Sequence, residues 1–212
     1  MTRYFIALAT AFLLLAPAAA ANQQTSAKGA YVFVTDLGRW AVAVMQSDRL
    51  SQSGRHALLG KLLMQRMDFD TLARHSLGSF AGQASEQEFE EFTNYFAAHF
   101  IDLALDRFAD MPIVGFAAVK LLRQGDGDVV VVTRIVKDER KPLVAGWRVR
   151  ARDGEYRIVD VLVEGGNSLA LHFRNQYEPE LTKHGIRSLI GRLRRLTTGS
   201  PTVTLVHQSR GD

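Results

Sequence analysis

The period of hydrophobic and polar positions changes twice along the chain, from helical to alternating and back to helical. Between residues 30 and 67, apolar side chains recur at every third or fourth position, with an interruption at residues 51–54. This spacing places them on one face of a helix, so two consecutive helices are predicted. Asp68 is expected to cap a further short helix, which Gly78 ends.

A longer helix is predicted from Ser85 to about Phe108. Ser85 and Glu88 have the spacing of a capping box, in which each side chain accepts a hydrogen bond from the other residue's backbone amide. An apolar stripe follows at helical spacing, and such a stripe is typical of either a packed core or a pocket wall. The stripe consists of Phe89, Phe92, Phe96, Phe100 and Leu103.

After Pro112 the pattern becomes that of strands joined by short links of turn residues, which predicts a four-stranded antiparallel meander. The predicted strands are residues 115–123, 129–136, 143–150 and 156–164. Helical spacing returns at residues 168–177 and 185–196, and Pro179 is expected to break or kink the chain between them.

The order of helices, sheet and helices predicts an α+β fold, with the helices packed against the sheet. A sheet covered on one side should alternate apolar and polar residues, but residues 129–132 are four consecutive valines. Residues 158–163 are likewise apolar on both faces of their strand, except for Asp160. Either helices cover both faces of the sheet or one face lines an apolar cavity, and the pattern leaves both open.

The first 21 residues have the three parts of a secretory signal peptide: a basic start, an apolar run and a small-residue exit. The apolar run is shorter than the roughly 20 residues that a membrane-spanning helix needs. Cleavage is expected near Ala20 or Ala21. A flexible N-terminus at residues 22–29, a single domain at residues 30–196 and a C-terminal tail at residues 197–212 are expected to follow.

The composition narrows the function classes. There is no cysteine, which excludes disulfides, thiolate metal sites and a lipoprotein anchor. The formal charge of +4 falls to +3 without Arg3, and an exported protein rarely meets nucleic acid, so no nucleic-acid partner is expected. A late basic cluster fits anionic headgroups, an acidic partner or a solvated helix face. It comprises Lys183, His184, Arg187, Arg192, Arg194 and Arg195.

No catalytic or metal-binding motif is present. No histidine pair has helical metal-site spacing, and there is no HExxH, GxSxG, GxGxxG or P-loop, so no metal or cofactor is expected. Asp68 and Asp70 fit a helix cap and a solvated carboxylate better than a cation site. Asp160, in the middle of an apolar strand, would serve either as a general base in a cavity or as a structural acceptor. An enzyme using Asp160 and a non-catalytic structural adaptor therefore remain alternative functions.

Several stretches together resemble the MlaC family, also called toluene-tolerance periplasmic proteins. The resemblance covers roughly residues 30–196 and depends on the order and spacing of the motifs. They are Asp68-Phe69-Asp70-x-x-Ala73-Arg74-x-x-Leu77-Gly78, the Phe89/Phe92/Phe96 helix, Ile158 to Gly165, Ser168-Leu169, Phe173-Arg174-x-Gln176-Tyr177 and Gly185-Ile186-x-x-Leu189-Ile190. The chain departs from the family in an acidic run at residues 86–91 and in Pro179.

The resemblance implies a monomeric periplasmic lipid carrier that helps to maintain outer-membrane lipid asymmetry. It implies a curved sheet, like the cone of nuclear transport factor, with lipid tails in a cavity between sheet and helices. The implied partners are an inner-membrane ABC transporter complex and an outer-membrane lipoprotein–porin complex. Because similar divergent members accompany hopanoid biosynthesis genes, the cargo implied is a phospholipid or a hopanoid-like lipid.

A carrier of this kind needs apolar residues on one sheet face and on the helices opposite. The predicted sheet contribution is Val119, Leu121, Val130, Val132, Trp147, Val161 and Val163. The predicted helix contribution is Phe92, Phe96, Phe100, Leu103, Phe173 and Tyr177.

Overall fold

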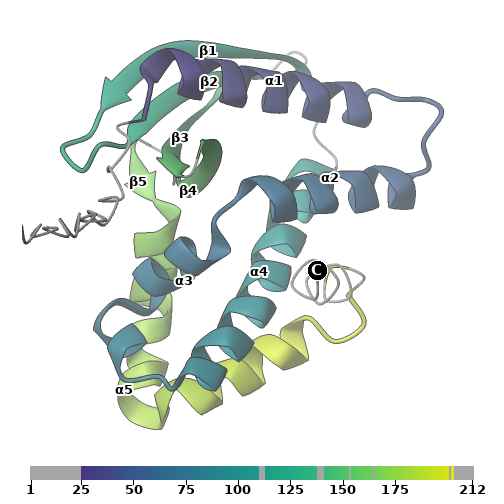
Figure 1. Ribbon diagram of the computed structural model, residues 1–212. Coiled ribbons are helices and arrows are strands. Elements are labelled where there is room, and N and C mark those ends of the chain that lie inside the picture. The colour runs from purple at the N-terminus through teal and green to yellow at the C-terminus, as the bar shows by residue number, and fades with distance from the viewer. Residues whose placement is uncertain are drawn as a thin grey trace, which may run out of the picture.

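The computed structural model describes residues 25–109, 113–137, 141–152, 154–163, 165–200 and 202. Its helices and five-stranded antiparallel sheet confirm the predicted α+β class. The curved, unclosed sheet and α1 form one end of the molecule, and α3, α4 and α5 form the other, with α2 between them (Figure 1).

The first two helices are α1 (Ala27–Met45) and α2 (Gln52–Arg66), close to the two predicted at residues 30–67. Each begins after a serine whose hydroxyl accepts a backbone hydrogen bond, as an N-cap does. Ser26 Oγ accepts from Gly29 at 3.3 Å, and Ser51 Oγ accepts from Gly54 at 3.1 Å. Helix α1 lies along the edge strand of the sheet (Figure 1).

The short helix α3 (Phe69–Leu77) has the predicted cap and the predicted end. Asp68 accepts hydrogen bonds from the Thr71 amide at 2.9 Å and the Thr71 hydroxyl at 2.8 Å. Gly78 has a φ of 58°, which a residue with a Cβ adopts only with strain. A Cβ there would also lie 2.5 Å from Arg174 Nε, so a larger residue would in addition displace the Arg174 side chain.

A 3-10 turn η1 (Gly78–Gly82) leads into α4 (Glu86–Ala109). The predicted capping box is present at its start. The Ser85 amide donates to Glu88 Oε2 at 3.0 Å, and the Glu88 amide donates to Ser85 Oγ at 3.2 Å. The long aromatic helix therefore begins where the sequence indicates.

The last helix corrects one prediction. Helix α5 (Leu169–Leu196) passes through Pro179, and its kink is at Gly185 instead. Proline removes one backbone donor, and here the helix continues through that loss. Gly185, with φ 74° and ψ 176°, lies outside the helical region altogether, so the chain turns there into a second helical arm.

The sheet has the order β1-β2-β3-β4-β5, in which every neighbouring pair is antiparallel. The predicted four-stranded meander is therefore confirmed, with a two-residue fifth strand added. The strands are β1 (Ile113–Arg123), β2 (Val129–Lys137), β3 (Leu143–Arg152), β4 (Glu155–Val163) and β5 (Asn167–Ser168).

The register assigns the residues of the sheet to its two faces. Trp147 lies opposite Val131 on β2 and Val161 on β4, so these three side chains share one face. Because side chains alternate along a strand, Val130 and Val132 lie on the other face. The face of Trp147 is the one that packs against α1, with Ala30 and Val34 against the valines of β2.

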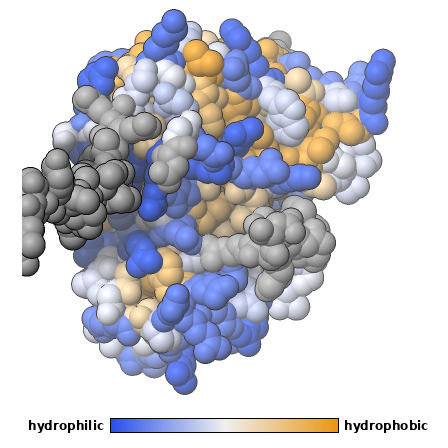
Figure 2. Space-filling model, in the orientation of Figure 1, coloured by the Kyte–Doolittle hydropathy of each residue, from blue (hydrophilic) through white to orange (hydrophobic). Residues whose placement is uncertain are grey.

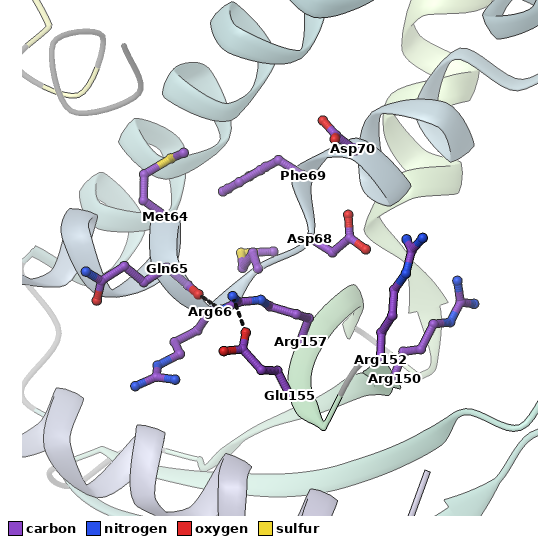
Figure 3. A pocket seen from close by; sticks show the side chains of 11 residues that line it. Met64, Gln65, Arg66, Asp68, Phe69, Asp70, Arg150, Arg152, Glu155 and Arg157 are labelled. Carbon is purple, nitrogen blue, oxygen red and sulfur yellow. Dashed lines mark hydrogen bonds and ion pairs between the residues drawn. The ribbon is translucent and has the colours of Figure 1, made fainter. Parts of the chain in front are cut away.

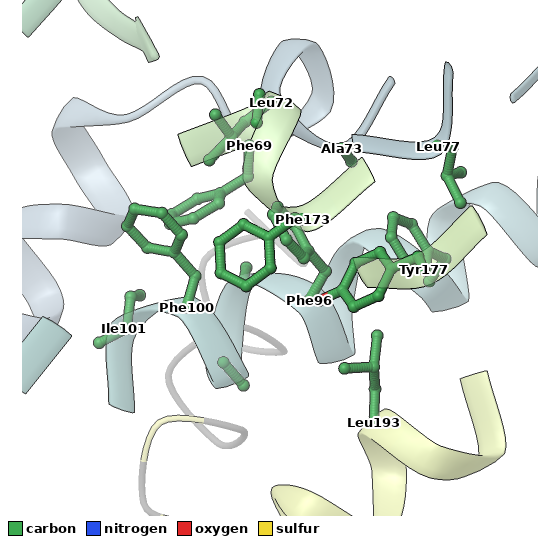
Figure 4. Close-up of a cluster of buried hydrophobic side chains, with 14 of the residues drawn as sticks. Phe69, Leu72, Ala73, Leu77, Phe96, Phe100, Ile101, Phe173, Tyr177 and Leu193 are labelled. Carbon is green, nitrogen blue, oxygen red and sulfur yellow. The ribbon is translucent and has the colours of Figure 1, made fainter. Parts of the chain in front are cut away.

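The main hydrophobic core lies at the helical end of the molecule. Leu72 and Leu77 of α3, Phe92 and Phe96 of α4 and Tyr177 of α5 are at most 1% exposed. Figure 4 shows the rings of Phe96, Phe173 and Tyr177 meeting between α4 and α5.

Three predicted segments lie at the chain ends. The predicted signal peptide, residues 1–21, lies outside the described residues. The predicted flexible N-terminus, residues 22–29, stays a prediction; within it Thr25 is 1% exposed, its hydroxyl accepts from the Ala151 amide at 2.8 Å, and α1 begins at Ala27. In the predicted tail, the Thr202 hydroxyl donates to Asp102 Oδ1 at 2.6 Å.

Candidate functional site

An apolar cavity of about 880 Å³ lies between the Trp147 face of the sheet and the helices. The four long helices contribute to it, namely α1, α2, α4 and both arms of α5, and the short helix α3 does not. Figure 2 shows apolar residues between α1 and α2 and in the recess between α2 and α4. Three leucines that line it, Leu103, Leu171 and Leu196, are 46–57% exposed, so the cavity opens to solvent between α4 and α5.

Seven of the thirteen predicted site residues line this cavity. On the sheet side they share one face, because Trp147 pairs with Val161 and Val163 follows two positions later. On the helix side they come from the second half of the α4 stripe and the first arm of α5. The seven are Phe100, Leu103, Trp147, Val161, Val163, Phe173 and Tyr177.

The other six lie elsewhere. Phe92 and Phe96 are fully buried in the helical core, with their rings 5.5 Å apart. Val130 and Val132 lie on the opposite face of the sheet, where Val130 packs beside Leu162 above Gly146.

The last two of the six, Val119 and Leu121, are on the edge strand β1. They are 49% and 40% exposed, and Val119 lies where the register shifts. Which face of each strand turns inward depends on pairing between strands, and a single strand's pattern does not contain that information.

Sequence reasoning missed the wall that α1 and α2 supply. Leu37, Ala41 and Met45 of α1 and Leu59 and Leu63 of α2 line the cavity. Their helical spacing was visible in the sequence, but it does not show what lies opposite the apolar face. Gly38 belongs to the same wall. A Cβ there would lie 2.2 Å from the Phe116 ring, so the glycine allows α1 to approach β1 closely.

Polar groups gather where the cavity meets α4 and α5. Arg192 Nε lies 2.7 Å from Glu180 Oε2, and the Ser188 hydroxyl donates to the other Glu180 oxygen at 2.8 Å. Burial lowers the pKa of the His99 imidazole and raises the pKa of the Tyr177 phenol. Both shifts favour the uncharged side chain, which suits an apolar ligand.

Asp160 is absent from the residues that line the cavity. It is 3% exposed, and its Oδ1 accepts from the backbone amides of Val161 at 2.8 Å and Ala170 at 3.2 Å. It therefore ties β4 to the start of α5, which agrees with the structural alternative rather than with a general base. Among the described residues, no group of three or more histidine, cysteine or acidic side chains could bind a metal ion.

The family model for the MlaC protein matches residues 38–195. The chain belongs to the MlaC family. A phospholipid-binding protein from Ralstonia solanacearum, solved in complex with a phospholipid, has a similar fold with a TM-score of 0.68. The two share 18% identity, and the match covers 84% of this chain and 98% of that one. No curated protein matches the sequence significantly.

Three of the six residues in the basic cluster of this MlaC family member, Arg187, Arg192 and Arg194, form ion pairs within the molecule. Arg187 Nε lies 2.7 Å from Glu88 Oε1, and Arg194 pairs with Glu91, so the second arm of α5 is fastened to the start of α4. Hydrogen bonds from Arg187 and from Ser85 lower the pKa of Glu88 to about 2. The acidic run that departs from the family is therefore the counterpart of the late basic cluster.

None of the helices among the described residues has the length and apolar composition to cross a bilayer.

Proposed function

We propose that the protein is a periplasmic carrier that encloses the acyl tails of a phospholipid in its apolar cavity. The observation that carries the proposal is the cavity of about 880 Å³ between the sheet and the helices. Membership of the MlaC family supports it, as does the similar fold of a phospholipid-binding protein solved with its lipid.

The energetics of transfer explain why a cavity is needed. Each methylene removed from water contributes about 0.8 kcal/mol, so two tails of roughly 15 methylenes each contribute on the order of 24 kcal/mol. A lipid that left a membrane unaided would lose that energy. A carrier with an apolar interior returns most of it, and lipid then crosses an aqueous space at a useful rate.

The proposed ligand contacts are the residues that line the cavity. They include the seven predicted positions and the wall from α1 and α2, represented by Leu37 and Leu59. The headgroup would lie at the opening between α4 and α5, where His172, Gln176 and Arg107 line the cavity. These side chains are polar and exposed, so little headgroup selectivity is expected.

The proposal extends to partners and location on the strength of the family resemblance. The carrier would act as a monomer and exchange lipid with an inner-membrane ABC transporter complex and an outer-membrane lipoprotein–porin complex. The signal peptide would be removed on export by cleavage near Ala20 or Ala21. N-terminal sequencing of the protein from the periplasmic fraction tests that site directly.

The decisive experiment is lipid analysis of protein purified without detergent. Solvent extraction and mass spectrometry should recover about one diacyl lipid per protein, and a hopanoid in its place would identify the alternative cargo. Stripped protein should take up phospholipid from vesicles. Finding no co-purified lipid together with no uptake would refute the carrier function.

A further inference from the structure

A second cavity, separate in character from the first, lies between the α2–α3 link and the β3–β4 hairpin. It has a volume of about 840 Å³, and Arg66, Arg150, Arg152 and Arg157 line it, so we call it the arginine cleft. Figure 3 shows Arg150 and Arg152 side by side, across from Arg66 and Arg157. Met67 lines both this cleft and the apolar cavity.

Two of the guanidinium groups are held in place by partners within the fold. Arg150 donates from Nε at 2.8 Å and from Nη2 at 2.9 Å to Asp128, which is 1% exposed. Arg157 donates to Glu155 at 2.6 Å and to the backbone carbonyl of Gln65 (Figure 3). Because these side chains are already ordered, a ligand of the cleft would not have to pay for ordering them.

The hydrogen-bonding capacity left in the cleft is mainly that of donors. Three carboxylates also line the cleft. Both oxygens of Asp68 accept from Thr71, Glu155 is paired with Arg157, and Asp70, like Arg152, already has a partner within the fold. An arginine carries five N–H donors and no acceptor, so these contacts leave donors over. Arg66 is exposed, and no acidic side chain of the described residues forms an ion pair with it.

We propose that the arginine cleft docks an acidic segment of a partner protein. Carboxylates of such a segment would accept from the remaining guanidinium donors, and an apolar side chain of the segment would contact Met64, which also lines the cleft. The cleft is concave, so a protruding peptide segment fits it better than the flat surface of a bilayer. The inference rests on the proposed function only in that a carrier must dock with a partner.

The test compares two charge reversals on α2. Arg66→Glu changes the cleft, and Lys61→Glu makes the same change at an exposed position that does not line it. The probe is a fluorescein-labelled peptide of eight glutamates around one phenylalanine, followed by fluorescence anisotropy. Arg66→Glu should raise the dissociation constant about tenfold, and Lys61→Glu by less than about twofold. Added salt should weaken the wild-type complex.

Three results would overturn the docking site. The first is equal weakening by the two variants, which would show a net-charge effect. The second is no binding of the peptide by wild-type protein that takes up lipid normally, which leaves the carrier function intact. The third is binding to vesicles containing 20% phosphatidylglycerol that Arg66→Glu abolishes and the peptide does not compete, which would assign the cleft to membranes. Normal lipid uptake by Arg66→Glu separates this test from that of the carrier.

Discussion

The two halves of the α4 apolar stripe have the same spacing and opposite surroundings. Phe92 and Phe96 in the first half are fully buried, and the Phe96 ring centroid lies 5.3 Å from that of Phe173. Leu103 in the second half is 46% exposed and lines the apolar cavity. Phe100, 5% exposed, belongs to both, since it contacts the core rings and lines the cavity.

The difference lies in what faces each half. Helices α3 and α5 close around the first half and fill the space with aromatic rings, as Figure 4 shows. The second half contacts α2 and faces the sheet and α1 across a cavity of about 880 Å³. An apolar stripe therefore shows which face of a helix avoids water, and the elements opposite decide whether that face becomes core or binding site.

The largest expected effect on stability comes from removing a buried ring from the packed half of the stripe. Phe96→Ala removes a fully buried ring that touches four other aromatic rings, and should lower the free energy of unfolding by about 3–5 kcal/mol. Leu103→Ala, on the same helix in the open half, should cost less than about 1 kcal/mol. Urea unfolding followed by circular dichroism measures both. Equal losses would mean that the two halves are equally packed.

Substitutions in the open half of the stripe should change phospholipid binding rather than the stability of the fold. Leu103→Arg places a charge at the cavity wall and should lower phospholipid uptake from vesicles at least about tenfold, because the tails would then contact a charged group. Its melting temperature should change little, since the position is already half exposed.

The matched control is Leu122→Arg, on the edge strand β1. Leu122 is 37% exposed and lies outside the residues that line the cavity. Uptake by this variant should equal that of the wild type. If both variants lose uptake alike, net charge rather than the cavity wall controls loading.

Local signals in the sequence predicted the elements well. The helix caps at Asp68 and Ser85 are hydrogen bonds between residues three positions apart, so the local sequence is enough to predict them. The strands of the meander are joined by short turns, which fixes their order. The break at Gly185 was missed in favour of Pro179, because a proline shows its constraint in the sequence and a glycine does not reveal its φ.

The candidate site depended on contacts between distant segments, and there the sequence was less informative. Val130 and Val131 are adjacent valines that the sequence does not distinguish. Only the pairing of Val131 with Trp147 shows which of them lies on the sheet face toward the cavity. The acidic start of α4 and the basic end of α5 were both visible, but their pairing over about a hundred positions was not. These ion pairs join the second arm of α5 to the start of α4, on the surface beside the packed half of the stripe.

The smallest expected effect on stability comes from breaking the Glu88–Arg187 ion pair between α4 and α5, and it should depend on pH. The pKa of Glu88 falls from its ordinary 4.5 to about 2 because Arg187 and Ser85 donate hydrogen bonds to the carboxylate. A carboxylate with a lowered pKa stabilises the folded state above its ordinary pKa, and this contribution is lost as the pH falls from 4.5 to 2.

Glu88→Gln should therefore lower the urea midpoint slightly at pH 7 and flatten the decline of that midpoint between pH 4.5 and pH 2. Glu90→Gln, an exposed acid on the same helix, should leave both unchanged. Parallel acid declines in wild type and Glu88→Gln would show that the Glu88–Arg187 ion pair does not stabilise the packing of α5 against α4.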